Sequence, residues 1–218
     1  MTNPEPEDGD SPRDTSEETD PDSAGGEHEE PLQWVTEDRE NAYSCPGFSI
    51  VHEEVTLPDG TTTDFDYLHD GPSVVILPFT PHGDLVLIEE WRQAVKQVTR
   101  GFPAGGIEPG EGFHQAAQRE LTEETGYETS DVYRLDTFEP ATGISDAVFH
   151  YFVATDCRPT GTQNLDEDES IRVVTSSLGD ILETLFQGDL KDGRTALGLL
   201  RYVVGDMDQI SVSPPNGP

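Results

Sequence analysis

Three glutamates, Glu120, Glu123 and Glu124, lie close together in a segment that is typical of a helix, residues 114–125. Like charges three and four residues apart on a helix repel each other, and anions near its C-terminal end oppose the helix macrodipole. Such carboxylates suit a hard divalent cation, since Mg²⁺ typically takes one or two carboxylates together with substrate phosphates. The spacing therefore allows a metal site. A solvated acidic helix in an acid-rich protein is the alternative that the spacing alone leaves open.

The expected helix has two different sides. Glu120 and Glu124 are one turn apart, whereas Ala117 and Leu121 mark another side that is suited to packing on a sheet. Gly126 is a natural residue to end the helix, because glycine readily adopts the left-handed conformation found there. We therefore expect one side of the helix to pack on a sheet and another to carry the carboxylates.

The fixed positions around this helix form one recognisable order. They are Gly105, Glu111, Arg119, Glu120, Leu121, Glu123, Glu124 and Gly126. This order resembles the Nudix box, the loop–helix–loop signature of the Nudix hydrolase family, with Tyr127 where the family usually has an aliphatic residue. The resemblance implies an α/β fold, an α/β/α sandwich with a mixed sheet. It also implies hydrolysis of a nucleoside diphosphate linked to another group X, with Mg²⁺ or Mn²⁺ as cofactor.

The resemblance also implies roles for the charged residues of the box. Glu120 and Glu124 are expected to be metal ligands, and Glu123 a further ligand or a supporting catalytic group. Arg119 is expected to hold Glu111 or a helix glutamate in place, as residues around a metal centre commonly do.

A longer stretch resembles one branch of the family. The run PAGGIEPGE, preceded by IEEWRQAV, is similar to the ADP-ribose pyrophosphatases, and the likeness extends over about residues 44–204. In that branch the backbone carbonyl at Ala104 is a metal ligand. Gly105 and Gly106 let the backbone turn sharply beside the substrate.

The arginine of the WR pair is Arg92, which the resemblance assigns to a substrate phosphate. Arginine suits this role because its guanidinium binds phosphate oxygens in pairs. The alternative for Arg92 is a surface ion pair with Glu89 or Glu90.

A second acidic segment, LDEDESIRVV, resembles the mobile loop that brings a carboxylate to the metals in this branch. Matched at IRV, Glu169 corresponds to a loop metal ligand, and Glu167 to the general base that activates water. The alternative is an acidic loop without a role, because Asp166 and Asp168 are equally available carboxylates.

One position departs from the ADP-ribose pyrophosphatase pattern. That branch usually has a proline sixteen residues after the last glycine of the box, and Thr142 stands there in this chain. We expect hydrolysis to persist, with ADP-ribose or a related nucleotide sugar as substrate. The strand aromatics Phe138, Phe149 and Tyr151 either stack a base or line the core.

Composition restricts the remaining functions. The chain of 218 residues has a formal charge of −33, with 45 acids and 12 bases, and residues 1–31 supply only a third of that charge. Such a field repels nucleic-acid backbones, so we expect no nucleic-acid partner. We interpret the acid-rich, lysine-poor composition as halophilic adaptation; an ordinary acidic protein with a charged tail is the alternative.

The cysteines and apolar runs bear on location. Cys45 and Cys157 are isolated and form no disulfide framework, the N-terminus lacks a signal peptide, and runs such as SVVILPF are strand-sized. We therefore expect a cytoplasmic protein without a membrane partner.

The chain divides into four expected parts: a disordered acidic tail (1–31), an N-terminal β-extension (32–70), a Nudix hydrolase domain (71–206) and a frayed end (207–218). The hydrophobic pattern predicts strands at 48–57 and 61–68 around a tight turn, and a second hairpin with strands at 73–79 and 85–91. Later strands are expected at 131–139, 148–156 and 172–177, and helices at 177–187 and 192–205. The extension resembles the part through which the branch dimerises, so we expect a homodimer.

Two other functions compete with a hydrolase. The first is a non-catalytic Nudix-fold sensor that binds a nucleotide sugar. The second is a Nudix-fold isomerase, whose chemistry needs a suitably placed cysteine or extra acid. The complete set of box carboxylates favours the hydrolase.

Overall fold

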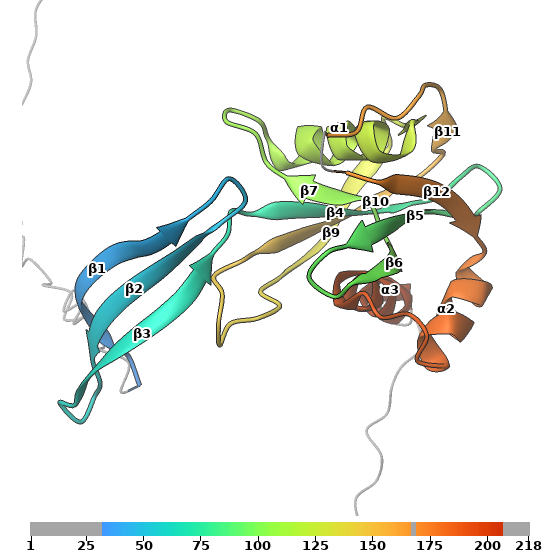
Figure 1. The fold of residues 1–218 in the computed structure, drawn as a ribbon. Coiled ribbons are helices and arrows are strands. Elements are labelled where there is room, and N and C mark those ends of the chain that lie inside the picture. Colours follow the sequence, from blue (N-terminus) through green and yellow to red (C-terminus); the bar gives the residue numbers. More distant parts are fainter. Residues whose placement is uncertain (1–31, 167–168, 207–218) are drawn as a thin grey trace, which may run out of the picture.

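The computed structural model describes residues 32–166 and 169–206 of the chain. The predicted disordered tail (1–31) and frayed end (207–218) lie outside these residues. The described chain folds into a layered body with a separate sheet projecting from one side (Figure 1). Within the described residues, no helix has the length and apolar character needed to cross a membrane.

The centre of the body is a mixed four-stranded sheet with the order β7-β4-β10-β9. Strands β4 and β10 run parallel, whereas β7 pairs with β4 and β9 with β10 in the antiparallel direction. Apolar runs make β4 and β10 the buried central strands. The bounds are β4 Ser73–Pro78, β7 Ala104–Gly106, β9 Val132–Phe138 and β10 Phe149–Ala154.

A second, antiparallel sheet has the order β12-β5-β6 and stands beside the first. A short pair, β8 and β11, lies beyond the end of the first helix. The bounds are β5 Leu85–Arg92, β6 Gln97–Gly101, β8 Tyr127–Glu128, β11 Arg158–Pro159 and β12 Ile171–Ser176.

Helices cover both faces of the body, α1 on one face and α2 and α3 on the other (Figure 1). Their bounds are α1 Phe113–Thr125, α2 Leu178–Phe186 and α3 Gly193–Asp206. The alternation along β4 feeds two cores: Val74 and Ile76 pack toward α1, and Val75 and Leu77 toward the other helices. The α/β/α sandwich implied by the resemblance is thus confirmed.

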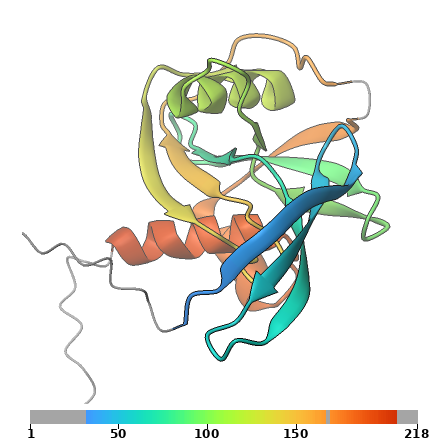
Figure 2. The same cartoon turned by 90° about the vertical axis from the view of Figure 1, so that its left-hand side faces the viewer.

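The projecting sheet has three antiparallel strands in the order β1-β2-β3, namely Val35–Ser44, Ser49–Thr56 and Thr62–His69. Figure 2 shows it in front of the body. The predicted pair corresponds to β2 and β3, and β1 was not predicted. Its sequence VTEDRENAYS carries four charged residues and no apolar alternation, and every one of its residues is exposed. The strand is held by ladder hydrogen bonds and by polar side-chain contacts such as the ion pair of Arg39 with Glu53, so it leaves little hydrophobic pattern to read.

The predicted hairpin of β4 and β5 is wrong in its pairing. The intervening turn is present, with the Thr80 amide donating to the Asp84 carbonyl at 2.8 Å. The two strands, however, meet only at one bridge, Phe79 with Leu85, and then enter different sheets. Strand β4 gives both its edges to β7 and β10, so no edge is left for β5.

The projecting sheet is joined to the body by the loop that contains Thr142. Leu68 bridges Ser145 in parallel. His69 Nδ1 lies 2.6 Å from the carboxylate of Asp146, which also accepts the Asp70 amide at 3.1 Å. The loop after β9 therefore fixes the point where β3 leads into β4.

Candidate active site

Helix α1 is defined at both ends by local contacts. At its start the Gly112 amide donates to the side-chain oxygen of Gln115 at 3.0 Å. At its end Gly126 has φ +70°, and its amide donates to the Thr122 carbonyl at 2.7 Å, as expected for a glycine that terminates a helix. The helix observed here, 113–125, matches the predicted span within one residue.

Two of the three helix glutamates, Glu120 and Glu124, are buried. Glu120 is 9% exposed and Glu124 only 3%, so the alternative of a solvated acidic helix is wrong. The Glu124 carboxylate accepts a hydrogen bond of 2.9 Å from the Ala104 amide in β7. A methyl group on Gly105 would lie 2.1 Å from a carboxylate oxygen of Glu120. Strand β7 and the side of α1 that carries the glutamates thus approach as closely as glycine permits. The sharp turn predicted at Gly105 and Gly106 is wrong, because both are part of strand β7, paired with β4; the glycine is needed for this close approach instead.

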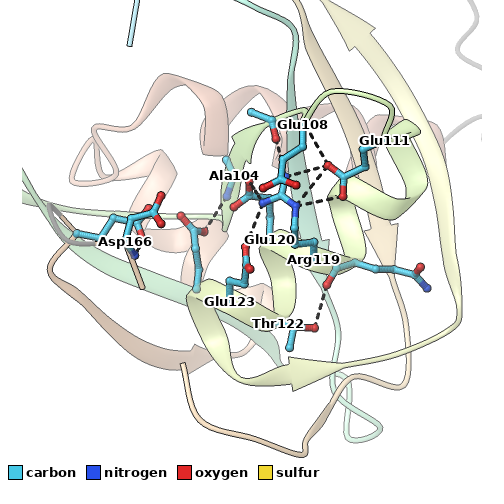
Figure 3. Close-up of polar contacts among 12 residues, drawn as sticks. Ala104, Glu108, Glu111, Arg119, Glu120, Thr122, Glu123 and Asp166 are labelled. Atoms are coloured by element: carbon cyan, nitrogen blue, oxygen red, sulfur yellow. Dashed lines mark hydrogen bonds and ion pairs between the residues drawn. The ribbon is translucent and has the colours of Figure 1, made fainter. Parts of the chain in front are cut away.

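Arg119 is the cation around which the remaining carboxylates gather (Figure 3). It contacts Glu111 at 3.0 Å, Glu120 at 2.8 Å and Glu123 at 3.0 Å. Its Nη2 also donates to the Gly106 carbonyl at 2.8 Å. The contact that the sequence predicted between Arg119 and Glu111 is therefore present. One guanidinium offsets much of the repulsion that the spacing of the glutamates creates.

Burial and mutual repulsion shape the protonation of these groups. Burial, with smaller contributions from Glu120, Glu169 and Glu90, raises the pKa of Glu124 to about 8. Burial also raises the pKa of Glu120 and of Glu90, whereas hydrogen bonding to Arg119 lowers the pKa of Glu111. Buried carboxylates that raise one another's pKa share one poorly hydrated space.

The loop between β11 and β12 passes over the C-terminal end of α1. Gln163 donates to the Glu124 carbonyl at 2.7 Å, and the Asn164 amide donates to the Glu123 carbonyl at 2.9 Å. These contacts bring Glu169 to the cluster, where its carboxylate also accepts the Asp166 amide at 3.0 Å. The proposed general base, Glu167, lies outside the described residues.

Arg92 makes an ion pair with Glu90 at 2.7 Å, the alternative that the sequence left open. Its side chain is still 37% exposed, so the pair leaves room for a further contact. Glu90 itself was missed as a site residue. The available signal was an acid at a buried position of the apolar strand LVLIEEW, where a charge is costly without a partner.

The three strand aromatics belong to the core. Tyr151 is fully buried and packs edge-on against Phe138 at 5.6 Å between ring centroids. Phe138 and Phe149 are partly buried, and both pack against the core cluster that contains Tyr151. The core interpretation is therefore confirmed for all three.

The cluster has the donor set that a hard divalent cation requires. Among residues 32–166 and 169–206, no three acidic, histidine or cysteine side chains are arranged so that they could together hold a metal ion. The fit rests on the chemistry of the donors: Glu120 and Glu124 are buried carboxylates with raised pKa values, and they lie beside strand β7, where Gly105 has no side chain. A bound cation would favour the ionised carboxylates that burial disfavours.

Comparison with known proteins gives independent matches. Residues 69–191 match the NUDIX domain family. The chain is 28% identical over 169 residues to the ADP-ribose pyrophosphatase of Bacillus subtilis (strain 168), covering 77% of this chain and 91% of that protein. It is also 28% identical over 148 residues to the methanol dehydrogenase activator of Bacillus methanolicus, covering 67% and 80%.

A solved structure shares the fold. The crystal structure of an ADP compounds hydrolase superposes with a TM-score of 0.72 at 24% identity, covering 83% of this chain and 98% of that one. The family match spans more than half of the sequence and includes the whole of helix α1, which carries the three glutamates. The chain therefore belongs to the Nudix family.

Proposed function

We propose that this Nudix pyrophosphohydrolase cleaves the diphosphate of a nucleotide sugar, ADP-ribose or a close relative, with Mg²⁺ or Mn²⁺ as cofactor. The products are a nucleoside monophosphate and a sugar phosphate. The sequence likeness to an ADP-ribose pyrophosphatase over most of both chains supports the substrate class. The observation that carries the proposal is the burial of Glu120 and Glu124 against strand β7 at Gly105. A buried acid needs a cationic partner, and only Glu120 has one, Arg119, among the described residues.

Some of the residues are proposed to bind the cation, and Arg119 keeps those ligands in position. Glu120, Glu124 and Glu169, with the carbonyl of Ala104, are the proposed ligands, and Glu123 is a ligand or a supporting group. When bound, the cation supplies positive charge that polarises the phosphoryl oxygens and acidifies water. Arg119 keeps the helix carboxylates in position through its contacts to Glu120, Glu123 and Glu111.

The reaction is the attack of water on one phosphorus of the diphosphate. The water oxygen forms the new phosphorus–oxygen bond, and the bridging oxygen leaves with the other phosphate. The water proton passes to Glu167 or to a neighbouring loop acid such as Asp166. Arg92 stabilises the phosphate charge, for which its partly exposed guanidinium is available, and Gly105 and Gly106 of β7 leave room for the substrate because they carry no side chains.

The first prediction concerns the reaction itself. In high KCl with Mg²⁺ or Mn²⁺, we expect the protein to convert ADP-ribose to AMP and ribose 5-phosphate, measured by chromatography of the products. Glu124→Gln keeps the size of the side chain and removes its charge, so kcat should fall by about 100-fold or more. Glu128→Gln, at an exposed position just beyond the helix, is the matched control. Binding of nucleotide sugars by a folded protein without cleavage would favour the sensor instead.

A second prediction tests the close approach of β7 and α1. In Gly105→Ala the added methyl collides with the Glu120 carboxylate, which must move, because the contact would be 2.1 Å. We expect about a ten-fold loss of kcat/KM with little change in melting temperature, since the clash is with the flexible end of a side chain. In Gly106→Ala the methyl meets nothing within 4 Å, so its loss should be clearly smaller. Equal losses would argue against a role for the contact with Glu120.

We also propose that the protein is a homodimer formed through the projecting sheet. Strand β1 is exposed along its whole length, and Trp34, Val35 and Tyr43 beside or within it are 45%, 56% and 57% exposed. Long exposed edge strands are usually paired or covered. Light scattering should give about twice the chain mass of 23.9 kDa, and Tyr43→Asp should shift the mass toward the monomer. A monomeric mass at every concentration would contradict the proposal.

A further proposal is that the protein is adapted to salt. The formal charge of −33 on 218 residues causes self-repulsion that salt screens. We expect the melting temperature, followed by circular dichroism, to rise steadily from low to molar KCl. A melting temperature that stays constant or falls over this range would favour an ordinary acidic protein.

A further inference from the structure

A cavity of about 420 Å³ includes Arg92 in its lining, the residue that forms the ion pair with Glu90. It draws on strands β5, β6 and β10 and on the start of α3. Its charged, polar and aromatic lining includes Arg92, Gln97, Phe149, Lys191, Asp192 and Arg194. The volume lies within the range of small-molecule sites.

The lining is unusual for this chain in its charge. The chain has 12 bases against 45 acids and only two lysines, yet three bases line this one cavity. Lys191 is one of the two lysines. Among the described residues that line the cavity, Asp192 is the single acid. A basic cavity in so acidic a protein indicates an anionic occupant.

The bases of the cavity are only partly neutralised. Arg194 Nε lies 3.6 Å from Asp192, whose carboxylate already accepts the Thr195 amide at 3.0 Å and its hydroxyl at 2.5 Å. The guanidinium carbon of Arg194 also lies 5.9 Å from the ring centroid of Phe149. The Lys191 ammonium contacts the Gly188 carbonyl, and no carboxylate in the described part of the chain forms an ion pair with it. Positive charge is therefore left over in the cavity.

Two of these bases lie at the N-terminal end of α3. Arg194 is in the first turn of the helix, and Lys191 lies two residues before Gly193, where the helix begins. Asp192, between them, is the one acid at this end, and its carboxylate accepts the Thr195 amide. The N-terminal end of a helix carries a partial positive charge that disfavours cations. An anion in the cavity would turn this repulsion into attraction.

Glu90 connects the cavity to the carboxylate cluster. Its carboxylate pairs with Arg92 on the cavity side and lies near enough to Glu169 and Arg194 for both to influence it. Glu90 and Arg92 alternate with exposed Trp91 along β5, so both point to the same face of the sheet. A substrate whose diphosphate lies at the cluster thus reaches the cavity past Arg92.

We propose that the cavity bounded by Arg92, Lys191 and Arg194 binds an additional phosphoryl group of the substrate, beyond the diphosphate that is cleaved. The inference rests on the proposed function for the placement of that diphosphate. The extra phosphate has two possible sources: a third phosphate in the chain between two nucleosides, or a phosphate on the distal sugar. Arginine and lysine together supply the donors that such a group needs.

Equilibrium binding tests the cavity separately from catalysis. Calorimetry in Ca²⁺ compares three ligands: ADP-ribose, diadenosine triphosphate, and ADP-ribose with a phosphate on its distal ribose. The variants are Lys191→Met, Arg194→Met and the double variant, with Lys191→Arg as the variant that keeps the charge. Arg158→Met, at an exposed position in β11, is the control because it removes the same charge from the whole protein. Melting curves verify that each variant is folded.

The double variant should bind at least one of the two phosphate-bearing ligands about ten-fold more weakly, and ADP-ribose at most about three-fold more weakly. If only diadenosine triphosphate binds more weakly, the cavity binds the third phosphate between two nucleosides. If only the modified ADP-ribose binds more weakly, the cavity binds the phosphate on the distal sugar. Lys191→Arg should retain binding, and Arg158→Met should bind all three ligands like the wild type. Equal losses for all ligands, no loss, or no binding of phosphate-bearing ligands by the wild type would overturn the proposal.

A parallel assay of ADP-ribose hydrolysis by the wild type separates the two claims. If the wild type hydrolyses ADP-ribose but the double variant loses no ligand selectively, the proposed phosphate site in the cavity is refuted and the proposed hydrolase function stands. If the double variant loses binding of a phosphate-bearing ligand selectively but the wild type does not hydrolyse ADP-ribose, the proposed hydrolase function is refuted and the anion site in the cavity stands.

Discussion

The burial of Glu120 and Glu124 against strand β7 at Gly105 is the constraint on which the rest of the site depends. Removing a carboxylate from water costs on the order of several kcal/mol unless partners compensate. Arg119 reaches Glu120, whereas the interaction found at Glu124 is with the amide of Ala104. The fold thus maintains an acidic space that is incompletely compensated by its own residues. Such a space is suited to a divalent cation and a diphosphate.

The architecture around that space serves to hold it. Both cores fix β4, to which the short strand β7 is paired, and α1 packs on the same sheet through Ala117 and Leu121. Gly126 ends the helix where the loop through Gln163 crosses it and brings Glu169 near. At the other side Thr195 of α3 accepts the Phe102 amide at 2.9 Å, which secures the segment leading to Ala104. Elements from distant parts of the chain therefore act together to position the carboxylates around one small space.

The sequence predicted those parts of the site that depend on local order. The helix and its terminal glycine follow from spacings within one short segment, and the family resemblance of that segment implied that Arg119 holds Glu111 or a helix glutamate. The pairing of β4 was mispredicted because it depends on β10, which lies far along the chain. Strand β1 was missed because its ladder involves backbone rather than apolar side chains. Glu90 was missed although it is an acid within an apolar strand, because only the fold brings β5 near Glu124.

Divalent-metal binding tests the central claim most directly. Mn²⁺ binding can be followed by electron paramagnetic resonance in the wild type, Glu124→Gln and the exposed control Glu128→Gln. We predict that the wild type and the control bind Mn²⁺ alike and that Glu124→Gln binds at least about ten-fold more weakly. If the folded wild type binds no Mn²⁺, or Glu124→Gln binds it equally well, the buried carboxylates are not the metal site and the account is contradicted.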